Sequence, residues 1–142
     1  MSTIMACLRA AATAVLLVAP RAQADDVADR MQQLGAALNR VAAAVESTVR
    51  YKNPRPDLTD AQLLALATKH KPEMLEPLAK YVVRVKREDG HAVVLICARK
   101  ANVALLEDTG CTARTDRHAW RSNPAVPCEF SVRPADACAP RR

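Results

Sequence analysis

The sequence has few aromatic residues and few glycines: one Trp, one Phe, two Tyr and three Gly in 142 residues. Proteins that bind single-stranded nucleic acids stack bases on aromatic side chains along a basic groove. This chain has neither feature, so we expect no nucleic-acid partner. Gly35, Gly90 and Gly110 are far apart, which excludes a glycine-rich loop that cradles phosphates. Because no other cofactor motif is present, we predict no cofactor.

An apolar run long enough to span a membrane is also missing. The N-terminus instead has the pattern of a secretory signal peptide. Arg9 precedes an apolar run over residues 10–19, and Ala22-Gln23-Ala24 supplies the small residues that signal peptidase requires. We predict that residues 1–24 are removed. Residues 25–142 then form a single small soluble domain in the periplasm or outside the cell.

Four cysteines follow the predicted cleavage site: Cys97, Cys111, Cys128 and Cys138. An even number of cysteines in a small exported domain predicts two disulfides, which can be paired in three ways. We favour Cys111–Cys128, which would close the loop between these residues, together with Cys97–Cys138, which would tie down the C-terminal tail. A bond between Cys97 and Cys111 across adjacent strands is the alternative.

The first part of the predicted domain, residues 25–80, has helical periodicity. Between Asp25 and about Tyr51, large apolar residues recur every three or four positions, which predicts an amphipathic helix. These residues are Val27, Met31, Leu34, Leu38, Val41 and Val45. We expect the apolar stripe to lie in the core. A homodimer through residues 27–45, or a structural protein that oligomerises through this helix, remains an alternative.

A second, shorter helix is predicted from Asp60 to about Lys69. Thr59 and Gln62 have the spacing of a capping box, in which each side chain bonds the main chain of the other. Pro72 then begins a short helical turn, because proline is favoured in the first turn of a helix.

The period changes to that of β-strands over residues 81–133. Tyr81–Arg87 alternates between apolar and charged residues, and Ala92–Ala98 is continuously apolar, as expected of a central strand. Val103–Glu107 and Cys128–Val132 are the third and fourth predicted strands. The predicted fold is therefore α+β: N-terminal amphipathic helices packed on a small antiparallel β-meander of three to four strands, stabilised by disulfides and followed by a short C-terminal tail.

The polar stretch Leu106–Trp120 carries the residues best suited to chemistry. Asp108, Asp116 and His118 could bind a metal or act in a hydrolase. However, no metal-ligand spacing accompanies them, and Cys111 is expected in a disulfide. We therefore predict no catalytic residue and no metal ligand, and the chain is more plausibly a binding protein than an enzyme.

The same stretch is expected to form a loop. In Asp108-Thr109-Gly110, the Asp108 side chain would bond the nearby main chain and Gly110 would adopt positive φ, as in a turn. His118 is expected to bond Asp116, and His91, in the turn between two strands, is expected to be exposed to solvent.

Three arginines surround Asp116 in this loop, which makes it locally basic. We predict a docking surface for a partner protein, formed by Arg114, Arg117, His118, Trp120 and Arg121. The function we expect is that of a protein-binding module, such as an inhibitor, an immunity-type protein or an accessory factor of the envelope. Its partner would be another exported or envelope protein. The alternative is a metal-binding protein or hydrolase that uses Asp108, Asp116 and His118.

Overall fold

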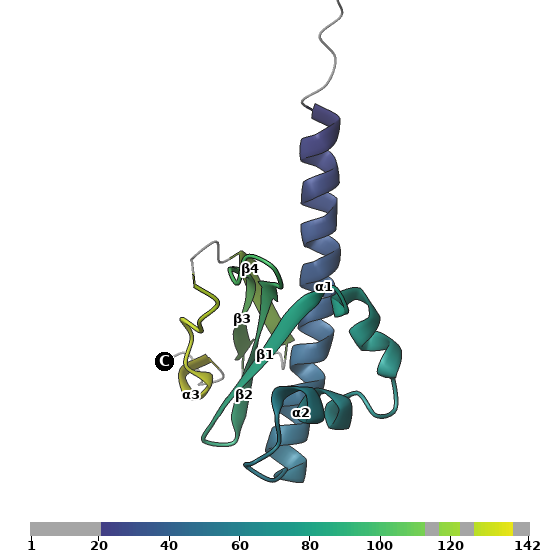
Figure 1. Ribbon diagram of the computed structural model, residues 1–142. Helices are drawn as coiled ribbons and strands as arrows, with labels where there is room; N and C mark the ends of the chain where they lie inside the picture. The colour runs from purple at the N-terminus through teal and green to yellow at the C-terminus, as the bar shows by residue number, and fades with distance from the viewer. Residues whose placement is uncertain (1–20, 113–116, 123–126, 138–142) are drawn as a thin grey trace, which may run out of the picture.

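The computed structural model describes residues 21–112, 117–122 and 127–137, and it confirms the α+β class (Figure 1). Helices cover one face of a four-stranded sheet with the order β1-β2-β3-β4, in which neighbouring strands are antiparallel. The elements are α1 (Arg21–Lys52), α2 (Asp60–Ala67), the 3₁₀ helix η1 (Pro72–Leu78), β1 (Tyr81–Glu88), β2 (His91–Ala98), β3 (Ala104–Thr112), β4 (Arg117–Ser122) and α3 (Pro134–Ala137).

Helix α1 forms the predicted apolar stripe, but its buried residues lie only between Leu34 and Val49. The buried apolar residues on α1 are Leu34, Ala37, Leu38, Val41, Ala42, Val45 and Val49. They pack on β2, β3 and β4, and the spacing of three and four keeps them on one side of the helix. The N-terminal part of α1, purple in Figure 1, projects past the sheet.

The contact between α1 and β4 depends on a glycine. A Cβ atom built on Gly35 would overlap the indole ring of Trp120, so only glycine allows this close approach. Trp120 is partly buried and packs on the core. It therefore helps to hold β4 against the helix.

The second helix begins as the sequence predicts. Thr59 Oγ1 accepts a hydrogen bond from the Gln62 main-chain N–H at 3.2 Å, and Gln62 Oε1 accepts one from the Thr59 N–H at 3.0 Å. This capping box fixes the start of α2, and Leu63 and Leu64 then enter the same core as the α1 stripe.

Strand β2 is the centre of the sheet, since all its residues from Ala92 to Cys97 are buried. It forms a hairpin with β1 through a two-residue turn at Asp89 and Gly90, whose φ angles of 51° and 77° fit a type I′ turn. The predicted strands Tyr81–Arg87 and Ala92–Ala98 are thereby confirmed, with one further residue at the turn end of each.

Two sequence predictions about the strands are wrong. Strand β3 continues to Thr112 and β4 occupies Arg117–Ser122, so most of the predicted polar loop is a β-hairpin. Cys128–Val132, the predicted fourth strand, is not a strand. These strands could not be predicted from alternation of apolar and polar residues. Several polar side chains of β3 and β4 are buried and bond one another, so they do not alternate with solvent-exposed residues.

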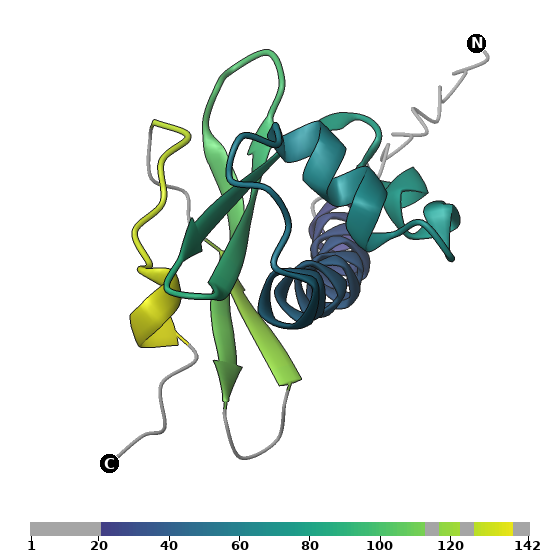
Figure 2. The ribbon, with the colours of Figure 1, turned by 90° about the horizontal axis from the view of Figure 1, so that it is seen from below.

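The other face of the sheet is covered by residues 127–137 (Figure 2). A disulfide joins Cys97 of β2 to Cys128, with 5.9 Å between their Cα atoms. Both preferred pairings, Cys111–Cys128 and Cys97–Cys138, are therefore wrong, and so is the alternative between Cys97 and Cys111. The reason is geometric: Cys97 points to the face along which Cys128 passes. The Cys111 side chain and Cys138 lie outside the described part of the chain.

The predicted signal peptide lies almost entirely outside the described residues, which begin at Arg21. In the part of the chain that the structure describes, no helix combines the length and the hydropathy needed to cross a membrane.

Candidate functional site

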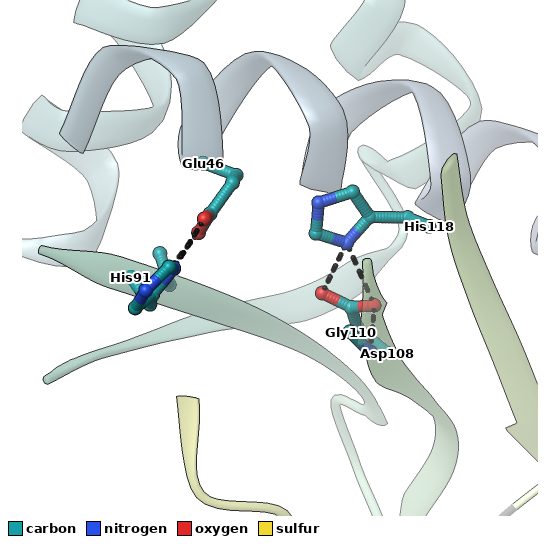
Figure 3. Close-up of polar contacts among 6 residues, drawn as sticks. Glu46, His91, Asp108, Gly110 and His118 are labelled. Carbon is teal, nitrogen blue, oxygen red and sulfur yellow. Dashed lines mark hydrogen bonds and ion pairs between the residues drawn. The ribbon is translucent and has the colours of Figure 1, made fainter. Parts of the chain in front are cut away.

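Two carboxylate–imidazole pairs lie between α1 and the sheet (Figure 3). One joins Asp108 of β3 to His118 of β4, and the other joins Glu46 of α1 to His91 at the start of β2. They are the described groups best suited to acid–base chemistry, because each places an imidazole against a buried carboxylate.

Asp108 and His118 are held together by an irregularity in β3. The register between β3 and β4 shifts between Asp108 and Gly110, and Gly110 has a φ of 87°, as in a β-bulge. The Gly110 N–H donates to Asp108 Oδ1 at 2.8 Å. Asp108 therefore bonds the main chain as predicted, but in a bulge inside a strand and not in a turn.

The bulge directs the Asp108 carboxylate towards His118. His118 Nδ1 lies 2.9 Å from both carboxylate oxygens, and the two side chains are 0% and 2% exposed, for Asp108 and His118 respectively. The predicted partner of His118 was Asp116, which lies outside the described residues. The structure instead pairs His118 with Asp108, ten positions away in the sequence.

We assign the Nδ1–H tautomer to His118, because the carboxylate can only accept. The Nε2 atom then has a free lone pair, and it is buried without a hydrogen-bond partner among residues 21–112, 117–122 and 127–137. The ring borders a cavity of about 50 Å³ beside α1. The cavity is lined by Ala43, Glu46, Ser47, Arg50, Tyr51 and His118.

This arrangement could accept a proton from a small molecule, but it lacks the other parts of a hydrolytic site. The cavity has room for a few water molecules and not for a peptide or sugar. Ser47 is the only serine among the described residues that line the cavity. It lies within α1, where the main-chain N–H groups form helix hydrogen bonds and cannot stabilise an oxyanion.

The second pair fastens the β1–β2 hairpin to α1. Glu46 is buried, and its two carboxylate oxygens accept from the His91 ring at 2.7 Å and from the Ala92 main-chain N–H at 2.5 Å. The His91 side chain is 24% exposed, so the expectation that it faces solvent freely is wrong. The contact could not be predicted from the local sequence, because Glu46 lies 45 positions before His91.

A further buried carboxylate, Glu107, lies on the opposite face of the sheet. It is fully buried and accepts from the main-chain N–H groups of Ser131 and Val132, at 2.6 and 2.9 Å, and from Arg121 at 2.9 Å. Burial alone would raise the pKa of Glu107, but the hydrogen bonds from Ser131, Arg121 and Val132 outweigh it and lower the pKa below its ordinary value.

The predicted docking residues are only partly brought together. His118 is buried against Asp108, Trp120 is partly buried on the core, and Arg121 is bound to Glu107. Arg114 and the side chain of Arg117 lie outside the described residues. Their role in partner binding stays a prediction. His118 is buried and Trp120 is partly buried, so neither side chain is prominent on the surface.

Exposed apolar side chains occur instead on α1. The two large hydrophobic residues that are exposed in the described chain, Val27 (56%) and Tyr51 (75%), lie near its two ends. Val27 belongs to the same stripe as Met31 and Leu34. The stripe that forms the core therefore continues past the sheet without a described segment to cover it.

Neither a metal centre nor a known relative identifies a function. Over the described residues, no three His, Cys, Asp or Glu side chains come together as a metal site. Comparison with protein-family models, with curated proteins and with solved structures found no match for the chain in any of the three.

Proposed function

We propose that this chain is a non-enzymatic exported protein that binds another exported or envelope protein through the projecting N-terminal part of α1. The observation that carries the proposal is the exposure of Val27 on the apolar stripe of a helix segment that extends beyond its own sheet (Figure 1). Export is supported by the signal-peptide pattern and by the Cys97–Cys128 disulfide, a bond typical of oxidising compartments.

The projecting segment suits a helix-in-groove mode of binding. Such helices insert apolar residues three or four positions apart into a groove on the partner, and Val27 with partly buried Met31 has this spacing. Asp25, Asp26 and Asp29 surround Val27 in the sequence. The complementary surface is therefore an apolar groove with basic residues at its rim.

A homodimer through the whole of residues 27–45 does not fit the structure. From Leu34 to Val45 the stripe is buried against the chain's own core, so those side chains are already covered. A second copy could reach only the part around Val27 and Met31. This part is short, and it offers far less apolar area than a stable dimer normally buries.

The proposal is tested with a photo-crosslinking residue at position 27 of the full chain, expressed in its own host. The matched control carries the same residue at Gln32, which is exposed on the opposite side of α1. We expect a crosslink to one other protein from position 27 and none from Gln32. The purified partner should bind the Val27→Asp variant about tenfold more weakly, with an unchanged thermal midpoint. Crosslinks at neither position, or only to a second copy of the chain, would refute the proposal.

A second candidate function is favoured by the contact between Asp108 and His118 and by the His118 Nε2 atom, which has no hydrogen-bond partner among the described residues. It is the metal-binding protein or hydrolase that would use Asp108, Asp116 and His118. Elemental analysis of the purified protein and assays with small ester substrates test it, with His118→Gln as the control. One equivalent of metal, or hydrolysis that His118→Gln abolishes, would support this function over the binding proposal.

A further inference from the structure

The outer edge of β1 is an open edge of the sheet. Among the described strands, β1 lies at one end of the sheet and pairs with β2 alone. Open edges attract other strands, because every second residue directs its N–H and C=O groups away from the sheet. What can bind there depends on which residues direct these groups outward, on the neighbouring side chains and on charge.

The hairpin turn determines which residues face outward. A two-residue turn makes the pair that flanks it, Glu88 and His91, a hydrogen-bonded pair. Hydrogen-bonded pairs then recur at every second residue, so Arg84 and Lys86 also bond β2. The residues between them direct their main-chain groups to the outer edge.

The outward-facing residues are Tyr81, Val83, Val85 and Arg87. Arg99 donates to the Tyr81 carbonyl at 3.1 Å, as expected if this oxygen is directed to the outer edge. In the described part of the chain, no hydrogen bond from outside β2 reaches the main-chain groups of Val83 or Val85. A stretch of free donors and acceptors therefore begins next to Tyr81.

An apolar groove lies beside this stretch. It has a volume of about 360 Å³ and runs between α2, η1 and β1, with walls that include Leu64, Leu75, Leu78, Tyr81, Val83 and Arg99. Side chains of Tyr81, Val83 and Val85 face the helical layer, where they pack on the main core. In a strand added at this edge, every second side chain would point to the same layer and enter the groove.

The other side chains of an added strand would meet positive charge. Arg84 and Lys86 lie on the opposite face of β1 from Val83 and Val85, and Arg84 also donates to the Cys128 main-chain carbonyl at 2.7 Å. Lys80 and Arg99 lie near the N-terminal end of β1. A second copy of β1 is a poor occupant, because symmetric antiparallel pairing sets Arg84 against Arg84 or Lys86 of the other copy.

We propose that the outer edge of β1 binds an extended segment of another protein in which apolar residues alternate with Asp or Glu. The main chain of that segment continues the sheet, its apolar side chains fill the groove, and its carboxylates face Arg84 and Lys86. Main-chain bonds supply affinity and the alternating side chains supply specificity, as in other cases of strand addition. This surface is separate from Val27, so it does not depend on the function proposed for α1.

The test uses a blocked seven-residue peptide of alternating Val and Glu, with isotope-labelled full-length protein in nuclear magnetic resonance titrations. We expect saturable shifts of the Val83 and Val85 amides and slower hydrogen exchange at both. The same peptide with N-methyl groups on the amides that face β1 should bind about tenfold more weakly, because it cannot complete the ladder. An alternating Val and Lys peptide should not bind.

Protein variants separate this site from other basic surfaces. Lys86→Glu should weaken binding about two- to fivefold, as expected for an exposed ion pair. Lys71→Glu, which makes the same change of charge beside Arg40 and Ala43 of α1, should leave binding unchanged, as should Val27→Asp. Absence of saturable binding, equal weakening by Lys71→Glu, or shifts confined to residues outside β1 and the groove would overturn the proposal.

Discussion

The two faces of the sheet are covered in different ways. On one face, α1, α2 and η1 bury a continuous apolar core that includes Leu38, Val41 and Leu63. On the other face, residues 127–137 contribute a small cluster around Cys97, Cys128 and partly buried Phe130. A long amphipathic helix is held by buried area, whereas a short segment with few apolar side chains depends on a disulfide and on Glu107.

Two adjacent carboxylates illustrate the difference. Glu107 and Asp108 are consecutive in β3 and both are fully buried, but they point to opposite faces because side chains alternate along a strand. Glu107 fastens the C-terminal segment through Ser131, Val132 and Arg121, and Asp108 orients His118 beneath α1.

Leu38→Ala should cause the largest loss of stability, because Leu38 is fully buried at the centre of the helical face. Removing a buried leucine side chain costs about 2–5 kcal/mol, including the cavity that it leaves. Urea denaturation followed by circular dichroism measures the loss. Val27→Ala on the exposed part of the same helix is the control and should change stability by less than about 0.5 kcal/mol. Equal losses of stability for the two substitutions would contradict the conclusion that only the sheet-facing part of α1 contributes to the core.

Removing the disulfide should affect mainly the other face. The double substitution Cys97→Ala with Cys128→Ala opens a link between residues that are 31 positions apart and should cost about 2–4 kcal/mol. Hydrogen exchange should show greater loss of protection at Ser131 and Val132 than at Val41. If protection of α1 fell by the same amount, the two faces would not be held independently.

Glu107 should make stability depend on pH. Its pKa is lowered in the folded protein, so the carboxylate stabilises the fold above the ordinary value of 4.5 and this contribution is lost as the pH falls through the lower, folded value. Glu107→Gln should cost about 1–3 kcal/mol at pH 7, since hydrogen bonds to a charged group are lost. Urea denaturation at pH 7 and pH 3 should show a smaller difference between the two pH values for Glu107→Gln than for the wild type.

Asp108→Asn should have the smallest effect. The amide oxygen of asparagine can still accept from His118 or from the Gly110 N–H, while the charge and the second acceptor oxygen are lost, at a cost of about 1 kcal/mol. The same urea assay should show a smaller loss of stability for Asp108→Asn than for Glu107→Gln. A larger loss for Asp108→Asn would show that the helical face depends on the hydrogen bond between Asp108 and His118 more than on its apolar area.

Much of the fold could be predicted from the sequence because its signals are local. The α1 stripe, the capping box of Thr59 and Gln62 and the strands of the first hairpin depend on residues within a few positions of one another. The hairpin of β3 and β4 could not be predicted in this way. Its buried Glu107, Asp108 and His118 look like loop residues until their partners are known.

The candidate site was predictable only as a set of residues. Asp108 and His118 were both singled out, but the pairing expected for His118 was with its neighbour Asp116. The β-bulge at Gly110 brings Asp108 to the ring instead, and a bulge depends on how two strands pair. Glu46 and His91 gave no signal at all, because their contact joins a helix to a strand far along the chain.

Local sequence patterns were sufficient to predict α1, α2, η1 and the first two strands, and with them the α+β class, but not α3. Hydrophobic periodicity and capping depend on residues within one or two helical turns, so they can be recognised without knowing the fold. Only the packing of the layers decided that Cys97 bonds Cys128, that Glu107 and Asp108 point to opposite faces, and that Val27 is exposed in the described part of the chain. These outcomes depend on which distant residues meet when the layers pack, and no local pattern encodes that.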